Sequence, residues 1–191
     1  MRKLVYYIAT SIDGFIADPE GDASHFPLPP ETLAAIFGRY PETCPAHLRE
    51  AFGVTGEARR FDTVLMGWRT HEPAVAAGLD GGGYPHLRQV VVTHRNIATT
   101  ESLEVMTGDV AAQVADLKRE AGRDIWLCGG ADLAAQLIDV IDEIQVKIYP
   151  VLLGRGISLF GGTTSLRQLD CTDIETLPGG VALATYRTGN R

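Results

Sequence analysis

The 191-residue sequence predicts a three-layer α/β/α sandwich on a mixed, mostly parallel sheet with an antiparallel C-terminal hairpin. Three observations support this prediction. Short apolar runs, which are typical of strands, alternate with segments that repeat apolar residues at helical spacing. Most of these runs are continuous, as in parallel strands that helices cover on both faces. Toward the end of the chain, apolar and polar residues alternate beside a Pro-Gly-Gly turn signal.

The predicted strands are spread along the whole chain. The first is KLVYYIAT at 3–10, whose β-forming residues suit a central strand that is covered on both faces. The other runs are TVLM at 63–66, QVVVT at 89–93, IWLC at 125–128 and EIQVKIYPVLL at 143–153.

The antiparallel hairpin is predicted from the end of the chain. In EIQVKIYP, alternate side chains face opposite sides of the strand, with Ile144 and Val146 on one side and Lys147 on the other. The segment GGVALATYR at 179–187 follows a turn signal at 178–180. Strands that behave in this way indicate antiparallel pairing, so the sheet is expected to be mixed.

Three segments are predicted to form the main helices. PAHLREAFGVTGEARR at 45–60 begins with a proline that suits a first helical turn. The segment 108–122 has Asp109 as N-cap and Gly122 as terminator. The segment 131–140 and its continuation place Leu133, Leu137 and Ile141 on one face.

The chain length and the loops favour a single domain covering 1–191, because one core commonly extends to about 200 residues. The Gly/Pro-rich stretches 18–30 and 78–86 are predicted to be surface loops, since strands of the same sheet flank each of them. No internal repeat interrupts this pattern.

Composition and charge exclude several classes of function. A formal charge of −7 without any basic run argues against nucleic-acid binding, and no segment reaches the roughly 20 apolar residues of a membrane helix. The N-terminus reads as a strand and not as a signal peptide. Three widely spaced cysteines fit a reducing cytoplasm. The five histidines form no close ligand pair, so we expect no bound metal.

Two adjacent glycines are the first candidate for a binding site. Gly129 and Gly130 end a predicted strand and open a predicted helix, which is where open α/β sheets bind ligands. Glycine allows a phosphate to approach the backbone closely, and a helix N-terminus attracts an anion. A tight turn with no ligand explains the pair equally well, since the full GxGxxG fingerprint is absent.

Two further strand ends carry residues of the same kind. In VLMGWRTHEP, Gly67 follows a strand, and Thr70 is a candidate N-cap of a short helix with Pro73 in its first turn. In VVTHRN, a strand end presents Thr93 and Arg95, and arginine is a bidentate partner for phosphate. An ordinary helix cap and a solvated arginine are the alternatives.

Two carboxylates are candidates for substrate binding or proton transfer. Asp13 lies between the first strand and a glycine turn, and Glu31 begins a short helical pattern in LPPETLAAIF. An ordinary Asp-Gly turn and a helix-dipole interaction explain them as well.

Five blocks together resemble the dihydrofolate reductase-like superfamily, in particular the branch of the riboflavin-biosynthesis reductase C-terminal domain and its stand-alone relatives. The blocks span residues 1–187 and are YYIATSIDGFIAD, DTVLMGWRTHE, IWLCGGADLAAQLI, DEIQVKIYPVLLGRGISLF and VALATYR. The resemblance implies an NADPH-dependent reductase of a small heterocyclic substrate, often homodimeric.

The resemblance also implies roles for individual residues. Ala9 and Ile16 would flank the nicotinamide, and Thr93 and Arg95 would meet the 2′-phosphate. The pyrophosphate and adenosine side would be lined by Gly67, Arg69 and Thr70, and the backbone cradle would come from Gly129, Gly130, Ala131 and Leu133. Two positions depart from the pattern: Trp68 stands where the family commonly has arginine, and Cys128 stands where the riboflavin reductase has glutamate.

The sequence therefore predicts a cytoplasmic NAD(P)H-dependent reductase that transfers hydride to a pteridine-, pyrimidine- or riboflavin-precursor-like heterocycle, as 5-amino-6-(5-phosphoribosylamino)uracil reductase or dihydrofolate reductase does. Asp13 or Glu31 would bind the substrate or supply a proton. The alternative is a non-catalytic dinucleotide-binding module of the same fold, and the two departures at Trp68 and Cys128 are consistent with it. A hydrolase would need a nucleophile and base that the sequence does not present.

Overall fold

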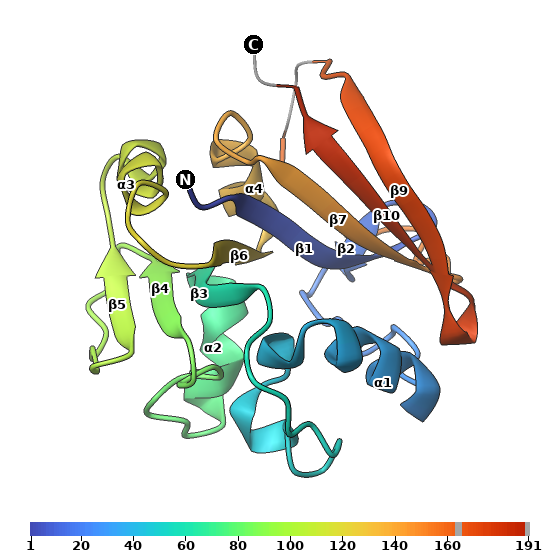
Figure 1. Cartoon of the computed structure of the whole chain (residues 1–191), viewed down its shortest axis with the longest axis horizontal. Coiled ribbons are helices and arrows are strands. Elements are labelled where there is room, and N and C mark those ends of the chain that lie inside the picture. Colours follow the sequence, from blue (N-terminus) through green and yellow to red (C-terminus); the bar gives the residue numbers. More distant parts are fainter. Residues whose placement is uncertain (163–165, 190–191) are drawn as a thin grey trace.

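An eight-stranded sheet forms the centre of the computed structural model, which describes residues 1–162 and 166–189 (Figure 1). The strand order is β5-β4-β3-β6-β1-β7-β10-β9. The first six of these strands run parallel, and β10 runs antiparallel to both of its neighbours. The predicted mixed, mostly parallel sheet is thus confirmed.

Six strands of this sheet match predicted segments to within a few residues, whereas β5 and β9 were not predicted. Their bounds are β1 Leu4–Ser11, β3 Phe61–Gly67, β4 Arg88–Val92, β5 Leu103–Met106, β6 Asp124–Gly129, β7 Glu143–Tyr149, β9 Leu169–Leu177 and β10 Val181–Thr188. A separate two-stranded ribbon consists of β2 Phe15–Ala17 and β8 Ile157–Ser158.

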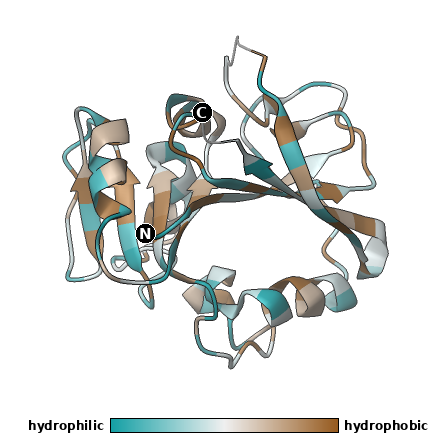
Figure 2. Ribbon diagram, turned by 45° about the horizontal axis from the view of Figure 1, so that its top comes forward, coloured by the Kyte–Doolittle hydropathy of each residue, from teal (hydrophilic) through white to brown (hydrophobic). Residues whose placement is uncertain are grey.

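Helices cover both faces of the sheet, as Figure 1 shows. The helices α3 Val110–Leu117 and α4 Ala131–Gln136 pack on one face, and α1 Pro30–Arg39 packs on the other. In Figure 1, α2 Trp68–Ala76 lies on the same side of the sheet as α1. Figure 2 shows the apolar residues concentrated along the strands between these layers. Within the described residues, no helix is long and apolar enough to cross a membrane.

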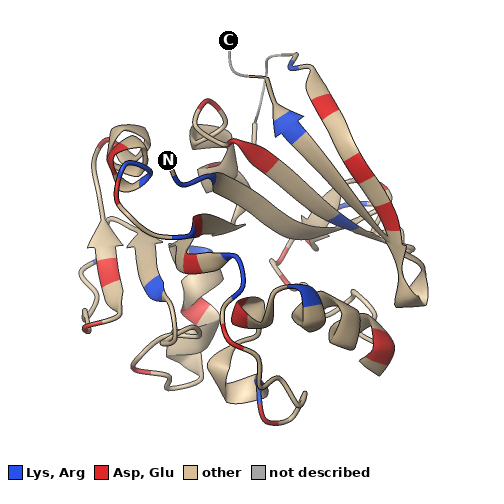
Figure 3. Ribbon diagram, viewed as in Figure 1, with Lys and Arg blue, Asp and Glu red and all other residues tan. Residues whose placement is uncertain are grey.

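The antiparallel hairpin is present, but its strands differ from those expected. The turn at Pro178–Gly180 joins β9 to β10, and Gly179 there adopts a φ of 81°. The predicted first strand of the hairpin, β7, pairs antiparallel with β10 and parallel with β1. The sequence of β9 concealed it because its side chains are mostly exposed and several are acidic, as Figure 3 shows.

The helix predicted at 45–60 is wrong. This segment contains a single short 3-10 turn, Ala46–Leu48, followed by turns and irregular chain. The carboxylate of Glu42 accepts hydrogen bonds from the backbone N–H groups of Arg59, Arg60 and Phe61 at 2.7–3.1 Å. The Arg49 guanidinium donates to two further backbone carbonyls. These tertiary hydrogen bonds replace helical ones, and Gly53 at a φ of 64° is incompatible with a continuing helix.

The two remaining helix predictions are confirmed with shorter bounds. Asp109 caps α3, and its carboxylate accepts a hydrogen bond from the Ala112 N–H at 3.0 Å. The helix ends at Leu117 with Lys118 as C-cap, so the prediction of Gly122 as its terminator is wrong. The segment 131–140 contains α4, and Leu133, Leu137 and Ile141 are buried together in the core as expected.

Candidate functional site

The glycine breaks after β3 and β6 lie side by side at the carboxyl ends of these parallel strands. A Cβ atom added to Gly67 would lie 3.8 Å from the Gly130 backbone nitrogen. Cβ atoms added to Gly129 and Gly130 would lie 3.8 Å and 3.7 Å from the Thr70 hydroxyl oxygen. Gly129 has a φ of 130°, and its peptide bond to Gly130 is cis. The three glycines and Thr70 therefore form a single backbone cradle, which larger side chains would fill.

Two short helices begin at this cradle. Gly130 is the N-cap of α4, and Gly67, not Thr70, is the N-cap of α2. The predictions of Thr70 as an N-cap and of Pro73 in the first turn are therefore wrong. The helix starts directly at Trp68, because Gly67 already supplies the extended backbone that a cap requires. This earlier start leaves the Thr70 hydroxyl free to face the two glycines.

Arg95 lies next to the cradle on the loop after β4. The Thr93 hydroxyl oxygen accepts a hydrogen bond from the Arg95 N–H at 3.0 Å. The Arg95 guanidinium lies over the indole of Trp68, 4.7 Å from the ring centroid, and the indole N–H donates to Glu72 at 3.0 Å. The departure from the family pattern at Trp68 thus has a physical consequence, because Trp68 supports a cation from the neighbouring strand. The Arg69 side chain is exposed.

Ala131 and Leu133 differ from the other cradle residues. Both are buried, and the Leu133 side chain belongs to the hydrophobic core under α4. The Ala131 carbonyl accepts a hydrogen bond from the Gly161 N–H at 3.1 Å. These residues hold the helix in place, and only their backbone is available to a ligand.

The two residues expected beside a nicotinamide lie on neighbouring strands. Ala9 is near the carboxyl end of β1 and Ile16 is in β2, and both are partly exposed. A serine hydroxyl holds the turn between the two strands, because Ser11 accepts a hydrogen bond from the Phe15 N–H at 3.0 Å. Both apolar side chains are therefore fixed by the same turn.

The Asp13 carboxylate joins two loops by hydrogen bonds. It accepts hydrogen bonds from the backbone N–H groups of Leu153 and Gly154 at 3.2 Å and 2.7 Å. Hydrogen bonds from Ser11 and from these backbone groups lower the pKa of Asp13, which is fully exposed. At neutral pH it is an anion that ties the turn after β1 to the loop after β7.

Glu31 lies at the start of α1 and is exposed. Its neighbour Thr32 is fully buried and donates a hydrogen bond to the Pro178 carbonyl at 2.7 Å. This bond anchors the helix start to the turn between β9 and β10. The helix therefore covers the sheet with Thr32 and Ile36, while Glu31 faces solvent.

The sequence analysis missed a cluster of titratable side chains beside the cradle. The Lys147 ammonium of β7 lies 3.5 Å from the centroid of the Tyr7 ring on β1. Burial lowers the pKa of Lys147 to about 7 and raises that of Cys128, on β6, to about 12. Tyr84 lies close to Cys128 and packs edge-on against Trp126, with ring centroids 5.1 Å apart. The signal for this cluster in the sequence was Lys147, a charged residue within a strand that was predicted to be buried.

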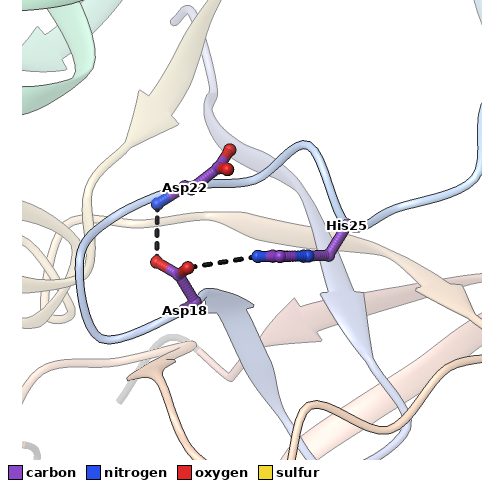
Figure 4. Close-up of side chains that lie close together, drawn as sticks. All are labelled: Asp18, Asp22 and His25. Atoms are coloured by element: carbon purple, nitrogen blue, oxygen red, sulfur yellow. Dashed lines mark hydrogen bonds and ion pairs between the residues drawn. The ribbon is translucent and has the colours of Figure 1, made fainter.

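A second polar cluster lies in the loop at 18–30. The Asp18 carboxylate is 3.1 Å from the His25 ring and accepts a hydrogen bond from the Asp22 N–H at 2.8 Å (Figure 4). One oxygen or nitrogen atom from each of the three lies within 4.8 Å of the others. Asp18 is partly exposed and the other two are exposed, and the hydrogen bonds close the loop on itself. This loop geometry accounts for the cluster without a bound ion.

The mixed sheet, its helices and a glycine cradle at the strand ends define a dihydrofolate reductase-like fold. A model of the RibD C-terminal domain matches residues 2–183, and the chain belongs to this family. The uncharacterized protein YwjB of Bacillus subtilis (strain 168) is 29% identical over 170 residues, which are 88% of each chain.

Solved structures share this fold over the full chain. A protein of Shewanella sp. PV-4 named for riboflavin biosynthesis superposes with a TM-score of 0.68 at 24% identity, over 99% of both chains. Dihydrofolate reductase from Enterococcus faecalis, in a complex with NADP(H), superposes with a TM-score of 0.61 at 16% identity. That match covers 98% of this chain and 96% of the reductase.

Proposed function

We propose that this protein is an NADPH-dependent reductase that transfers hydride to an unsaturated bond, such as C=N, of a pyrimidine- or pteridine-like heterocycle. The observation that carries the proposal is the convergence of Gly67, Gly129, Gly130 and Thr70 next to Arg95. A dinucleotide needs both features, because its pyrophosphate must approach the backbone and a 2′-phosphate needs a fixed cation.

The residues present fit the cofactor. The cradle would hold the pyrophosphate, because Cβ atoms at its three glycines would occupy the space in front of the Thr70 hydroxyl and the Gly130 N–H. Arg95, held over Trp68, would bind the 2′-phosphate together with Thr93, and the exposed Arg69 would extend the positive charge. When bound, the nicotinamide supplies the hydride.

The chain's own residues would position the substrate and exclude water. Ala9 and Ile16 present small apolar surfaces from β1 and β2, where the nicotinamide would lie. Asp13 would act as an anion, since its lowered pKa makes it a poor proton donor, and it would bind substrate or orient water. Glu31 would contact the substrate from the start of α1. We also propose that the protein works as a homodimer, is cytoplasmic and comprises one domain over 1–191.

The test is cofactor binding followed by turnover. Isothermal titration calorimetry should show NADPH binding more tightly than NADH, and NADPH should raise the melting temperature. NADPH oxidation should then be followed spectrophotometrically with 5-amino-6-(5-phosphoribosylamino)uracil and with dihydrofolate. Failure to bind NADPH would sink the proposal. Binding without oxidation of either compound would support the non-catalytic dinucleotide-binding module instead.

A further inference from the structure

Lys147 occupies a distinctive position on the central sheet. It pairs in register with Ala9 of the adjacent parallel strand, so the two side chains leave the same face as neighbours. Tyr7 and Cys128 lie on this face of β1 and β6, and Cys128 directly precedes the cradle. The Lys147 ammonium therefore lies over the Tyr7 ring, on the same face of the sheet as Ala9, which is proposed to contact the nicotinamide.

The amine of Lys147 has no ion pair or hydrogen bond to any other residue that the structure describes. The two other lysines of the chain are paired: Lys118 with Asp142 at 2.7 Å, and Lys3 with Glu143 at 3.5 Å. An ammonium that is partly buried without an anion loses hydration, and the contact with the Tyr7 ring offsets only part of this cost. Lys147 nevertheless keeps part of its surface exposed, so a ligand can reach it.

The charged groups closest to this face are engaged elsewhere. Glu42 accepts three backbone hydrogen bonds, and Arg39 of α1 forms an ion pair with Glu175 of β9. The groups that face Lys147 are uncharged near pH 7, because burial raises the pKa values of Tyr7, Cys128, Tyr84 and Tyr149. No charged group of the described residues pairs with the amine, so it is open to a hydrogen-bond acceptor on a ligand.

We propose that Lys147 is the catalytic residue that contacts the reducible bond of the substrate and donates the proton to its nitrogen or oxygen. This inference rests on the proposed function. In the reaction, the carbon of the C=N or C=O bond receives the hydride and its two electrons, and the π bond breaks. The heteroatom takes the proton from the ammonium, NADPH leaves as NADP⁺, and water returns a proton to the amine.

The same geometry selects the edge of the substrate that faces the amine. An ammonium only donates hydrogen bonds, so it is satisfied by an oxo oxygen or an imine nitrogen and not by an amino group. A substrate orientation that turns such an acceptor toward Lys147 is therefore favoured over one that turns an amino group toward it. With a pKa of about 7, Lys147 populates both its charged and its neutral form at neutral pH, as proton transfer requires.

The first experiment uses the fact that the chain has only three lysines. Reductive ¹³C-methylation should give three lysine NMR signals in addition to that of the N-terminal amine. The single variants Lys147→Arg, Lys118→Arg and Lys3→Arg assign the lysine signals. We expect the Lys147 signal to titrate near pH 7. A Lys147 signal that titrates at the ordinary high pH of a lysine would overturn the proposal, and this result does not depend on any substrate.

The second experiment measures turnover and cofactor binding in the same proteins. With 5-amino-6-(5-phosphoribosylamino)uracil, Lys147→Met should lower kcat at least 100-fold and abolish the pH dependence near 7, with the Kd for NADPH unchanged within twofold. Lys3→Met, which removes an exposed lysine, should behave as wild type.

The outcomes separate the two proposals. Loss of NADPH binding in the wild-type protein overturns the proposed function. Full turnover in Lys147→Met overturns the role of Lys147 and leaves the reductase assignment intact. NADPH binding without reduction of either compound supports the non-catalytic dinucleotide-binding module and overturns both proposals.

Discussion

The two faces of the sheet bury similar numbers of apolar side chains, but they differ in whether their polar groups have hydrogen-bond partners. Tyr6 and Tyr7 are neighbours on β1 and point to opposite faces. The Tyr6 hydroxyl donates to the Leu159 carbonyl at 2.9 Å, whereas the buried Tyr7 hydroxyl has no partner among the described residues. Likewise Lys118, at the end of α3, is paired, and Lys147 on the α1 side is not.

This difference separates stability from function. On the face under α3 and α4, each polar group named above has a hydrogen-bond or ion-pair partner, as expected of a core whose role is packing. The face under α1 keeps an unpaired amine and an unpaired hydroxyl next to the glycine cradle. Unsatisfied polar groups at a site are a stability cost that a bound ligand can offset.

The largest expected effect is a loss of stability on the α4 face. Leu137 is fully buried in the core there, so Leu137→Ala should lower the free energy of unfolding by about 2–5 kcal/mol. Urea unfolding followed by circular dichroism would measure this change. The matched control is Leu152→Ala, which truncates an exposed leucine and should cost almost nothing. Equal losses in both variants would show that burial does not distinguish the two positions.

Gly129→Ala should weaken cofactor binding and stability together. The variant places a Cβ in the cradle and strains a backbone with a φ of 130°, so we expect at least tenfold weaker NADPH binding and about 1–3 kcal/mol lower stability. Gly78→Ala is the control, because Gly78 also has a positive φ but no atom within 4 Å of the added Cβ. It should lose stability alone. Weaker binding in both variants would argue for a global effect of strain.

The sheet could be predicted from the sequence because its strands are continuous apolar runs whose burial dictates their pairing. The exposed strand β9 could not be predicted, because its pairing with β10 determines it. The segment at 45–60 could not be predicted either, because hydrogen bonds to the Glu42 carboxylate hold its end. The glycines of the cradle were visible as motifs. Lys147 was overlooked because its significance comes from what surrounds it across three strands, and the sequence does not show those neighbours.

The third expected effect is a gain of stability that depends on pH. The folded-state pKa of Lys147, about 7, lies below its ordinary value of 10.5, so the unfolded chain binds more protons between these pH values. Stability should therefore rise with pH through this window, with the full cost present below about pH 7. Lys147→Met removes the cost, and because the side chain is partly exposed we expect a gain of about 1–2 kcal/mol at pH 6. The gain should shrink through this window and vanish only above about pH 10.5 in urea unfolding, and a constant gain would contradict the assignment.

Tyr6 and Tyr7 allow the same substitution to be compared on the two faces of the sheet, with a smaller expected change in stability. Tyr6→Phe removes a hydroxyl that has a partner and should lower the free energy of unfolding by about 1 kcal/mol. Tyr7→Phe removes a buried hydroxyl that has none and should leave stability unchanged or slightly increased. Urea unfolding of both variants under identical conditions measures the difference. A loss in Tyr7→Phe as large as that in Tyr6→Phe would mean that the Tyr7 hydroxyl is satisfied in solution.

The smallest expected effect concerns the support of Arg95 by Trp68. Trp68→Leu removes the ring 4.7 Å below the guanidinium, and the lost cation–π interaction should weaken NADPH binding by about 0.5–1 kcal/mol. NADH lacks the 2′-phosphate that Arg95 is proposed to bind, so its affinity should not change. Calorimetry with both cofactors on Trp68→Leu and on the control Phe52→Leu, an exposed aromatic residue, makes the comparison. Equal weakening of NADPH and NADH would place Arg95 away from the 2′-phosphate and assign Trp68 a general packing role.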